Sequence, residues 1–162
     1  MPLVIIIAVL GIAADQISKL IVSQTIPLEQ SVTHNTGVAF GLFEGAFWLF
    51  IPITIIISAA LIWWLVKNRP VHLLMRIASG LILAGGIGNL IDRIFLGYVR
   101  DFIHVNINFA IFNIADSLVV IGAILLGIYV LFIHDKYIEA TKEIKAAEKN
   151  EEETDDAQSA QP

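Results

Sequence analysis

PLVIIIAVLGIAADQISKLIV, residues 2–22, is the first of four long apolar runs that decide the fold of this 162-residue chain. The other three runs occupy residues 46–66, 73–91 and 114–134. Each run is close to the roughly 20 residues that an α-helix needs to cross the hydrocarbon core of a bilayer. We therefore predict an α-helical polytopic membrane protein with four transmembrane helices.

The first run is expected to remain in the protein rather than to be a cleaved signal peptide. Met1-Pro2-Leu3 carries no Lys or Arg, and the apolar run continues past Lys19 to Val22. A secretory signal peptide would begin with a positively charged region and end at a small-residue cleavage site.

Lys and Arg are unevenly distributed over the connections, and this distribution predicts the orientation in the membrane. Residues 23–46 contain neither type, whereas Lys67, Arg69 and Arg76 surround the connection between the second and third runs. The positive-inside rule then places both termini and this connection in the cytoplasm. The outward connections, residues 23–46 and 97–112, are expected to form a small β-sheet, because non-helical backbone beside a membrane must find hydrogen-bond partners.

Two parts of the chain differ in composition. Residues 1–135 form the predicted four-helix membrane domain, and residues 136–162 are rich in Lys, Glu and Asp. Such a segment cannot bury enough apolar surface to fold independently. We expect it to continue the last helix briefly into the cytoplasm and then to be disordered.

Asp101 and Asp116 are the candidate catalytic residues. An ionisable side chain at a membrane edge is a functional hypothesis by default. Alternation over residues 98–105 places Asp101 beside apolar neighbours, with Arg100 on the other side of the strand, and such surroundings raise the pKa of a carboxyl group. Asp116 has a structural alternative, because Asn113 is a typical helix N-cap and a carboxylate three positions later can return the capping interaction.

Other polar residues and small residues follow helical spacing. Asp15 and Lys19 are one turn apart and are expected to form an ion pair, with Lys19 reaching the interface. Asn89 and Arg93 share one face at the outer end of the third run. Gly80, Ala84 and Gly88 recur at intervals of four, which predicts close packing of a second helix.

Several reaction classes lack their motifs. The chain has no cysteine, no His-Glu-x-x-His zinc motif, no Gly-x-Ser-x-Gly elbow and no nucleotide-binding glycine loop. It also has no basic patch for nucleic acid. The remaining chemistry is a pair of aspartates acting on water, for which no metal or cofactor is required.

Four segments, in order, resemble bacterial lipoprotein signal peptidase, also called signal peptidase II. They are Asn35-Thr36-Gly37-Val38-Ala39-Phe40, Gly88-Asn89-Leu90-Ile91-Asp92-Arg93, Val99-Arg100-Asp101-Phe102-Ile103 and Phe112-Asn113-Ile114-Ala115-Asp116-Ser117. The likeness covers about residues 3–134. Two positions depart from the family pattern: Arg100 is usually apolar there, and Val38 replaces a common alanine.

The resemblance implies a membrane aspartyl endopeptidase with Asp101 and Asp116 as catalytic residues. It also implies that five further residues line or brace the site: Asp15, Asn35, Asn89, Arg93 and Asn113. The implied substrates are prolipoproteins cleaved just before a diacylglyceryl-modified cysteine, at the outer face of the bacterial cytoplasmic membrane. Membrane lipids are the other expected partners, and no obligate protein partner is predicted. The alternative is a small proton-coupled transporter or channel subunit that uses the same aspartates as a relay.

Overall fold

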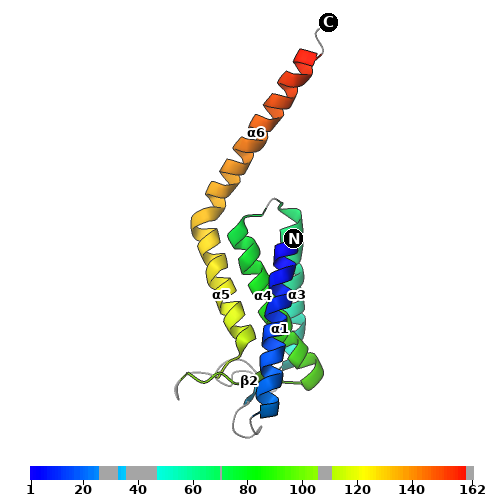
Figure 1. The fold of residues 1–162 in the computed structure, drawn as a ribbon, viewed down its shortest axis with the longest axis vertical. Helices are drawn as coiled ribbons and strands as arrows, with labels where there is room; N and C mark the ends of the chain where they lie inside the picture. The colour runs from blue at the N-terminus through cyan, green and yellow to red at the C-terminus, as the bar shows by residue number, and fades with distance from the viewer. Residues whose placement is uncertain (26–32, 36–46, 70, 106–110, 160–162) are drawn as a thin grey trace. The chain divides into compact units, whose positions relative to one another are not determined.

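The computed structural model describes residues 1–25, 33–35, 47–69, 71–105 and 111–159. The chain divides into two compact units, Met1–Leu126 and Gly127–Pro162. Within the first unit, long helices lie side by side (Figure 1), the last of them included up to Leu126. These helices are α1 (Pro2–Thr25), α3 (Phe47–Lys67), α4 (Leu73–Leu96) and α5 (Ile114–Ile128).

Four helical stretches in the described part of the chain are long and apolar enough to cross a membrane. They are Pro2–Thr25, Trp48–Lys67, Leu73–Leu96 and Ile114–Asn150. The prediction of four spans is therefore confirmed. The third helix continues to Leu96 rather than ending near residue 91, which keeps Asn89 and Arg93 inside a helix.

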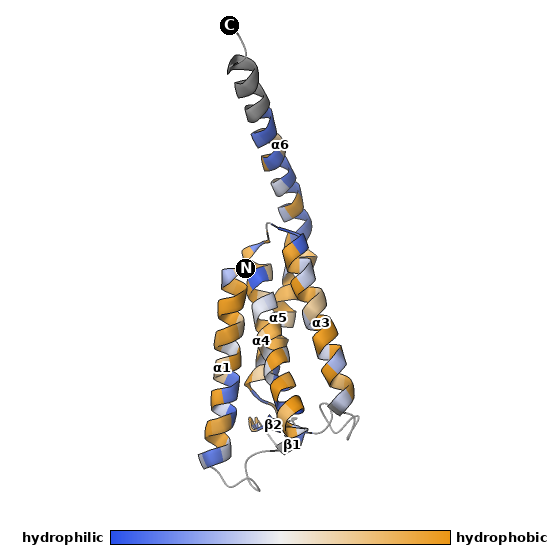
Figure 2. Ribbon diagram, turned by 90° about the vertical axis from the view of Figure 1, so that its right-hand side faces the viewer, coloured by the Kyte–Doolittle hydropathy of each residue, from blue (hydrophilic) through white to orange (hydrophobic). Residues whose placement is uncertain are grey.

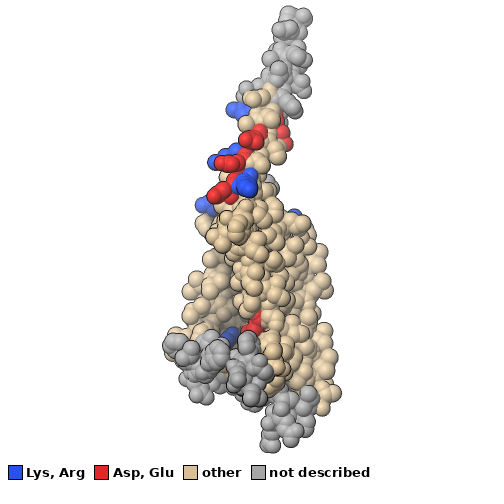
Figure 3. Space-filling model, turned by 90° about the vertical axis from the view of Figure 1, so that its left-hand side faces the viewer, with Lys and Arg blue, Asp and Glu red and all other residues tan. Residues whose placement is uncertain are grey.

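Polar and apolar residues are distributed as expected for a protein in lipid. Large apolar side chains face outward, among them Ile56, Phe95 and Leu131, while Asp15, Lys19, Asp92, Asp101 and Asn113 are buried. Figure 2 shows hydrophilic positions of α1 gathered in the half nearer the strands. On the face seen in Figure 3, a broad band of the helix bundle carries no charged side chain.

Helix α4 is the centre of the first unit, and it packs most extensively against α1 and then α3. Its small residues allow this approach. A Cβ added at Gly80 would lie 2.9 Å from the Ile7 side chain, and one at Gly88 would lie 2.7 Å from Asp15 Oδ2. The packing role predicted for Gly80, Ala84 and Gly88 is thus confirmed, because α1 and α5 occupy the space that larger side chains would need.

Gly97 ends α4 and turns the chain toward the strands. Its φ of 81° lies in the left-handed region, and its N–H donates to the carbonyl oxygen of Arg93 at 3.2 Å. Strand β2 (Val99–Asp101) follows directly and pairs antiparallel with β1 (Thr33–Asn35). Asn35 lies opposite Val99, and Thr33 lies opposite Asp101.

The predicted small sheet is present as these two strands, and an isolated bridge joins Ile103 to Phe112. The bridge returns the chain from β2 toward the start of α5, so it brings Asp101 near Asn113. Residues 26–32, 36–46 and 106–110 of the outer connections, which include Val38, lie outside the described residues.

The second unit contains the end of α5, a π-helical segment η2 (Tyr129–Ile133) and helix α6 (His134–Ser159). Where the sequence predicted a brief helix followed by disorder, α6 runs to Ser159. Its Ala, Glu and Lys residues favour helix intrinsically, and opposite charges such as Glu139 and Lys142 are three positions apart on one face. The domain boundary at residue 135 stays a prediction.

Candidate active site

Asp101 is buried at the end of β2 and is held by two amides. Only 2% of the Asp101 surface is exposed. Asn35 Nδ2 donates to its Oδ2 at 2.8 Å, and Asn113 Nδ2 donates to its Oδ1 at 2.6 Å. Alternation along the strand predicted only apolar neighbours for this carboxylate. The structure adds two amide donors, because β1 and the residue before α5 lie beside the end of β2.

Burial nevertheless raises the pKa of Asp101 to about 6. Loss of solvation is the largest cause, and the charge of Asp116 raises the pKa further. The amide donors of Asn35 and Asn113 act in the opposite direction, as does the charge of Lys19. The predicted direction is confirmed for Asp101, although its polar neighbours limit the shift.

Asp116 lies in the first turn of α5 and forms a reciprocal cap with Asn113. The Asp116 N–H donates to Asn113 Oδ1 at 2.9 Å, and the Asn113 N–H donates to Asp116 Oδ2 at 3.1 Å. The predicted capping interaction is therefore present. The cap uses only one carboxylate oxygen of Asp116, Oδ2. The other, Oδ1, accepts a hydrogen bond from Asn89 Nδ2 at 2.8 Å.

Asn89 and Asn113 connect the two aspartates through their side-chain amides. Asn113 Nδ2 donates to Asn89 Oδ1 at 3.1 Å as well as to Asp101. Among the described residues, each of the four carboxylate oxygens of Asp101 and Asp116 accepts one hydrogen bond. A carboxylate oxygen has two lone-pair sites, so each oxygen is oriented yet keeps capacity for water or a proton.

Asp15, Lys19, Asp92 and Arg100 form a buried charge cluster behind these amides. Lys19 Nζ lies 2.8 Å from Asp15 Oδ2 and 3.3 Å from Asp92 Oδ2, and it donates to Asn89 Oδ1 at 3.0 Å. The expected Asp15–Lys19 pair is confirmed. The expectation that Lys19 reaches the interface was wrong, since its side chain is 0% exposed and its acceptors come from α1 and α4.

Asp15 also anchors the start of α5. Its Oδ1 accepts a hydrogen bond from the Ala115 N–H at 3.0 Å, one residue before Asp116. The first N–H groups of a helix have no partner within the helix, so an outside carboxylate there satisfies a donor and complements the helix dipole. Asp15 thus braces the site by fixing the helix that carries Asp116.

Arg100 holds β2 against α4. Its Nη2 lies 2.7 Å from Asp92 Oδ1, while its backbone N–H and Nε donate to Asp92 Oδ2 at 3.0 and 3.2 Å. Nη2 also donates to Gln16 Oε1 at 3.0 Å. The hydrogen bond with Asp92 raises the pKa of Arg100 above its usual value.

Gln16 and the Arg100–Asp92 clamp are the parts of the site that sequence reasoning missed. The side chain of Arg100 lies on the other side of β2 from that of Asp101, as alternation predicted. From there it donates a hydrogen bond to Asp92, eight residues earlier in the chain. The Gly97 turn could have suggested this return. Gln16 donates to Asp15, to the Gly88 carbonyl oxygen and to Asp92, and it had no distinguishing signal in the sequence.

Arg93 faces the aspartates from α4. Its guanidinium carbon lies 5.4 Å from the centre of the Phe50 ring, a cation–π arrangement. Its positive charge interacts most strongly with the carboxylate of Asp116, then with those of Asp101 and Asp92. Its Nε is buried and has no hydrogen-bond acceptor among the described residues. Arg93 therefore supplies positive charge next to the two aspartates and keeps a free donor.

The sequence matches known proteins over most of its length. The family described as Signal peptidase (SPase) II matches residues 7–132. The lipoprotein signal peptidase of Geobacillus thermodenitrificans (strain NG80-2) is 42% identical over 135 residues, covering 75% of this chain and 84% of that protein. That of Staphylococcus aureus (strain JH9) is 39% identical over 155 residues, covering 87% and 94%.

Solved structures of bacterial membrane enzymes share the fold. One, determined by the in meso method at 2.3 Å resolution, has a TM-score of 0.76 and 39% identity, covering 81% of this chain and 88% of its own. Another, at 1.9 Å resolution, has a TM-score of 0.74 and 38% identity, covering 82% and 95%. Together with the four apolar helices, these structures show a multi-pass membrane protein.

Proposed function

Because this chain belongs to the signal peptidase II family, we propose that it is an aspartic endopeptidase in which Asp101 and Asp116 activate water. Its relatives are named lipoprotein signal peptidases, and this chain removes signal peptides from prolipoproteins in the same way. The transporter alternative has no support in the family or its named relatives. The proposed cleavage site is the bond before a diacylglyceryl-modified cysteine.

The observation that carries this proposal is the pair of carboxylates joined through Asn89 and Asn113. Two adjacent carboxylates do not both ionise readily, so such a pair shares a proton. Charge balance supports the same state. Asp101 and Asp116 together would carry two negative charges beside Arg93, and a single proton on the pair leaves this group neutral.

Asp116 is the proposed general base. It is more accessible than Asp101 and lies at the N-terminus of α5, where the helix dipole favours negative charge. It takes a proton from the water that attacks the scissile carbonyl carbon. The free lone pairs on its oxygens provide the place for that water.

Asp101 is the proposed general acid. The buried, neutral carboxyl donates a hydrogen bond to the developing oxyanion and then gives its proton to the leaving amine. Asn35 and Asn113 fix its two oxygens. Asn89 fixes Asp116, and Arg93 supplies a positive charge and a free donor for a substrate oxygen.

Cleavage by purified protein tests the assignment. The substrate is a prolipoprotein carrying diacylglycerol on its cysteine, and the same precursor without the lipid serves for comparison; masses identify the products. We expect cleavage of the lipidated precursor only. Asp101→Asn and Asp116→Asn should each lower the rate by about 10²–10⁴-fold, the usual contribution of a positioned acid or base.

Asp135→Asn is the matched control, since it removes a carboxylate from an exposed position of α6. It should cleave at the wild-type rate. Near wild-type cleavage by either Asp101→Asn or Asp116→Asn would exclude the aspartate pair as the catalytic residues. Equal cleavage of both precursors would exclude recognition of the lipid.

A further inference from the structure

The ammonium group of Lys19 is directed at three acceptors, and one of them belongs to the amide that holds Asp116. Lys19 is fully buried. Its Nζ lies 2.8 Å from Asp15 Oδ2 and 3.3 Å from Asp92 Oδ2, and it donates to Asn89 Oδ1 at 3.0 Å. An ammonium group has three N–H donors, so this set of contacts uses all of them.

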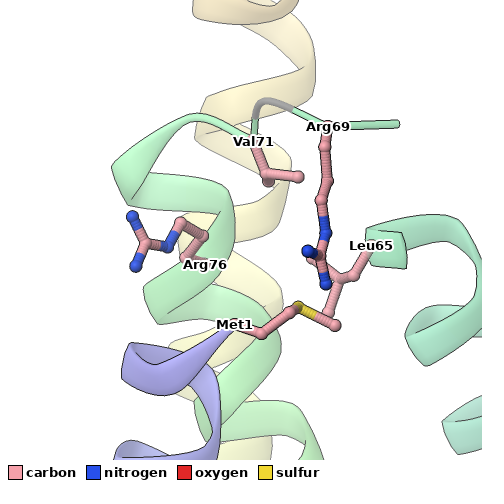
Figure 4. Close-up of a pocket in the computed structure, with 5 residues that line it drawn as sticks. All are labelled: Met1, Leu65, Arg69, Val71 and Arg76. Atoms are coloured by element: carbon pink, nitrogen blue, oxygen red, sulfur yellow. The ribbon is translucent and has the colours of Figure 1, made fainter. Parts of the chain in front are cut away.

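The arginines at the other end of the first unit are arranged differently. Arg69 and Arg76 line a cavity of about 510 Å³ together with Met1, Leu65 and Val71. Figure 4 shows their guanidinium groups pointing in different directions, Arg69 toward Met1 and Arg76 away from it. These two cations do not converge on one group, whereas the contacts of Lys19 converge on the site.

Lys19 decides which way the side-chain amide of Asn89 points. An ammonium group donates hydrogen bonds and cannot accept them, so the amide oxygen must face Lys19. Asn113 Nδ2 donates to the same oxygen at 3.1 Å, and the two donors occupy both of its lone pairs. The amide nitrogen of Asn89 is then left to donate to Asp116 Oδ1 at 2.8 Å.

The positive charge of Lys19 also acts on the aspartate pair. Burial is the largest influence on the pKa of Asp101 and raises it, whereas the charge of Lys19 lowers it. Arg93 from α4 is a second cation that interacts with both aspartates. The other charged groups of the described site bind Lys19 or one another: Asp15, Asp92 and Arg100.

We propose that Lys19 is a positioning residue of the peptidase, which acts on Asp116 through the side-chain amide of Asn89. Because it is fully buried, Lys19 does not contact the substrate. It keeps the Asn89 nitrogen on Asp116, so that the carboxylate stays oriented and charged while it activates water. This inference rests on the proposed function of the aspartate pair.

Steady-state cleavage of the lipidated precursor tests this role, with Asp15→Asn as the reference. The amide oxygen introduced at position 15 can still accept from the Ala115 N–H. Lys19→Met/Asp15→Asn removes one cation and one anion, so the buried charge cluster keeps its net charge. Relative to Asp15→Asn, kcat should fall about tenfold or more, the scale of one hydrogen bond to a charged group. KM should change less than about twofold, because no substrate contact is removed.

The pH dependence of kcat provides a readout that a merely structural role would not move. Activity on the acid side requires a negative charge on the aspartate pair, and loss of a nearby cation disfavours that charge. The acid-side midpoint should therefore lie at higher pH in Lys19→Met/Asp15→Asn than in Asp15→Asn. Neither KM nor this midpoint depends on the folded fraction, so partial unfolding cannot mimic the result.

Two further variants separate the hydrogen bond from the ion pairs. Lys19→Gln/Asp15→Asn restores a donor toward Asn89 Oδ1 and should recover part of kcat. Asp92→Asn/Arg100→Gln is the matched control, because it removes the neighbouring ion pair but leaves the Lys19–Asn89 hydrogen bond. It should lose stability and keep the acid-side midpoint of the wild type.

Two results would overturn the inference. One is a kcat and an acid-side midpoint in Lys19→Met/Asp15→Asn equal to those of Asp15→Asn. The other is an equal shift of the midpoint in Asp92→Asn/Arg100→Gln, which would make Lys19 one of several interchangeable charges. Failure of the proposed function has a different signature, which is absence of cleavage by the wild type or near wild-type cleavage by Asp116→Asn, and it would overturn this inference as well.

Discussion

At the scale of single residues, the burial of Asp101 makes the stability of the protein depend on pH. The folded state favours the protonated carboxyl, since its pKa rises to about 6 from about 4 in an unfolded chain. The folded state therefore binds the proton more tightly, and stability falls as pH rises from about 4 through 6. Two pKa units correspond to about 3 kcal/mol.

Asp101→Asn isolates this effect. Thermal unfolding in detergent between pH 4.5 and 7.5 should show a smaller loss of stability with rising pH in the variant than in the wild type. Comparing slopes removes the constant cost of replacing one hydrogen-bonded oxygen by an amide. Parallel slopes for the two proteins would mean that Asp101 is not the group that titrates.

Arg100 should contribute to stability and activity although its side chain lies on the other side of β2 from that of Asp101. Arg100→Gln leaves Asp92 with Lys19 as its only cation in the buried charge cluster. We expect a loss of about 1.5–3 kcal/mol, the value of hydrogen bonds to a charged group, together with slower cleavage. Arg100→Lys keeps the charge without the fork and should recover part of both, as melting and cleavage assays can establish. Wild-type stability in Arg100→Gln would contradict the clamp.

Residues with local partners were the predictable part of the site. Asn113 and Asp116 cap one another across three positions, and Asp15 and Lys19 pair within one turn, so their spacing carries the information. The burial of Lys19 was not predictable, because its acceptor Asn89 lies 70 residues away. The hydrogen bonds from Asn35 and Asn113 to Asp101 did not follow from spacing for the same reason, because β1 and the residue before α5 meet Asp101 only after folding. The resemblance alone placed both residues at the site.

At the scale of elements, the contact of α4 with α1 and α5 predicts a sharp difference between two neighbouring glycines. Gly88→Ala would place its Cβ 2.7 Å from Asp15 Oδ2, whereas the nearest atom at Gly86 is Thr54 Cγ2 at 3.4 Å. Overpacking at Gly88 should cost about 1–3 kcal/mol. It should also reduce cleavage, since Asp15 anchors the start of α5.

Gly86→Ala is the control for Gly88→Ala. It should be neutral or stabilising by up to about 1 kcal/mol, because Ala favours helix more than Gly does. Melting temperatures and cleavage rates of both variants decide the matter. Similar behaviour of the two variants would show that close packing at Gly88 is not required.

Elements were predicted well where hydrophobicity or small-residue spacing marks them. The four spans and the close face of α4 follow from such patterns. The length of α6 and the Arg100–Asp92 clamp did not. Helix α6 has strong intrinsic propensity despite its polarity, and the clamp depends on the left-handed turn at Gly97, which sequence spacing alone does not place in space.

At the scale of the whole molecule, the distribution of Lys and Arg predicts which end of the bundle faces the cytoplasm. Lys67, Arg69 and Arg76 lie at the end opposite the aspartates, so the positive-inside rule places Asp101 and Asp116 at the outer surface. The chain has no cysteine, which permits a labelling test. Gln24→Cys at the end of α1 should react with an impermeant thiol reagent in intact cells.

Asn68→Cys, just beyond α3, is the complementary variant. It is exposed like Gln24 but belongs to the opposite end of the bundle. It should react only after the membrane is opened. The reverse labelling pattern would put the aspartates on the cytoplasmic side and would exclude cleavage of exported precursors.

The ion pair within α1 also has a consequence for biosynthesis. Asp15 is translated 100 residues before Ala115, whose N–H it binds in the finished protein. During that interval Lys19, only one turn away, can neutralise it within the same helix. We expect α1 to enter the bilayer as a neutral segment and to wait there for α4 and α5. The protease thus becomes competent only when the last span has been inserted, so we expect an unfinished chain on the ribosome to have no peptidase activity.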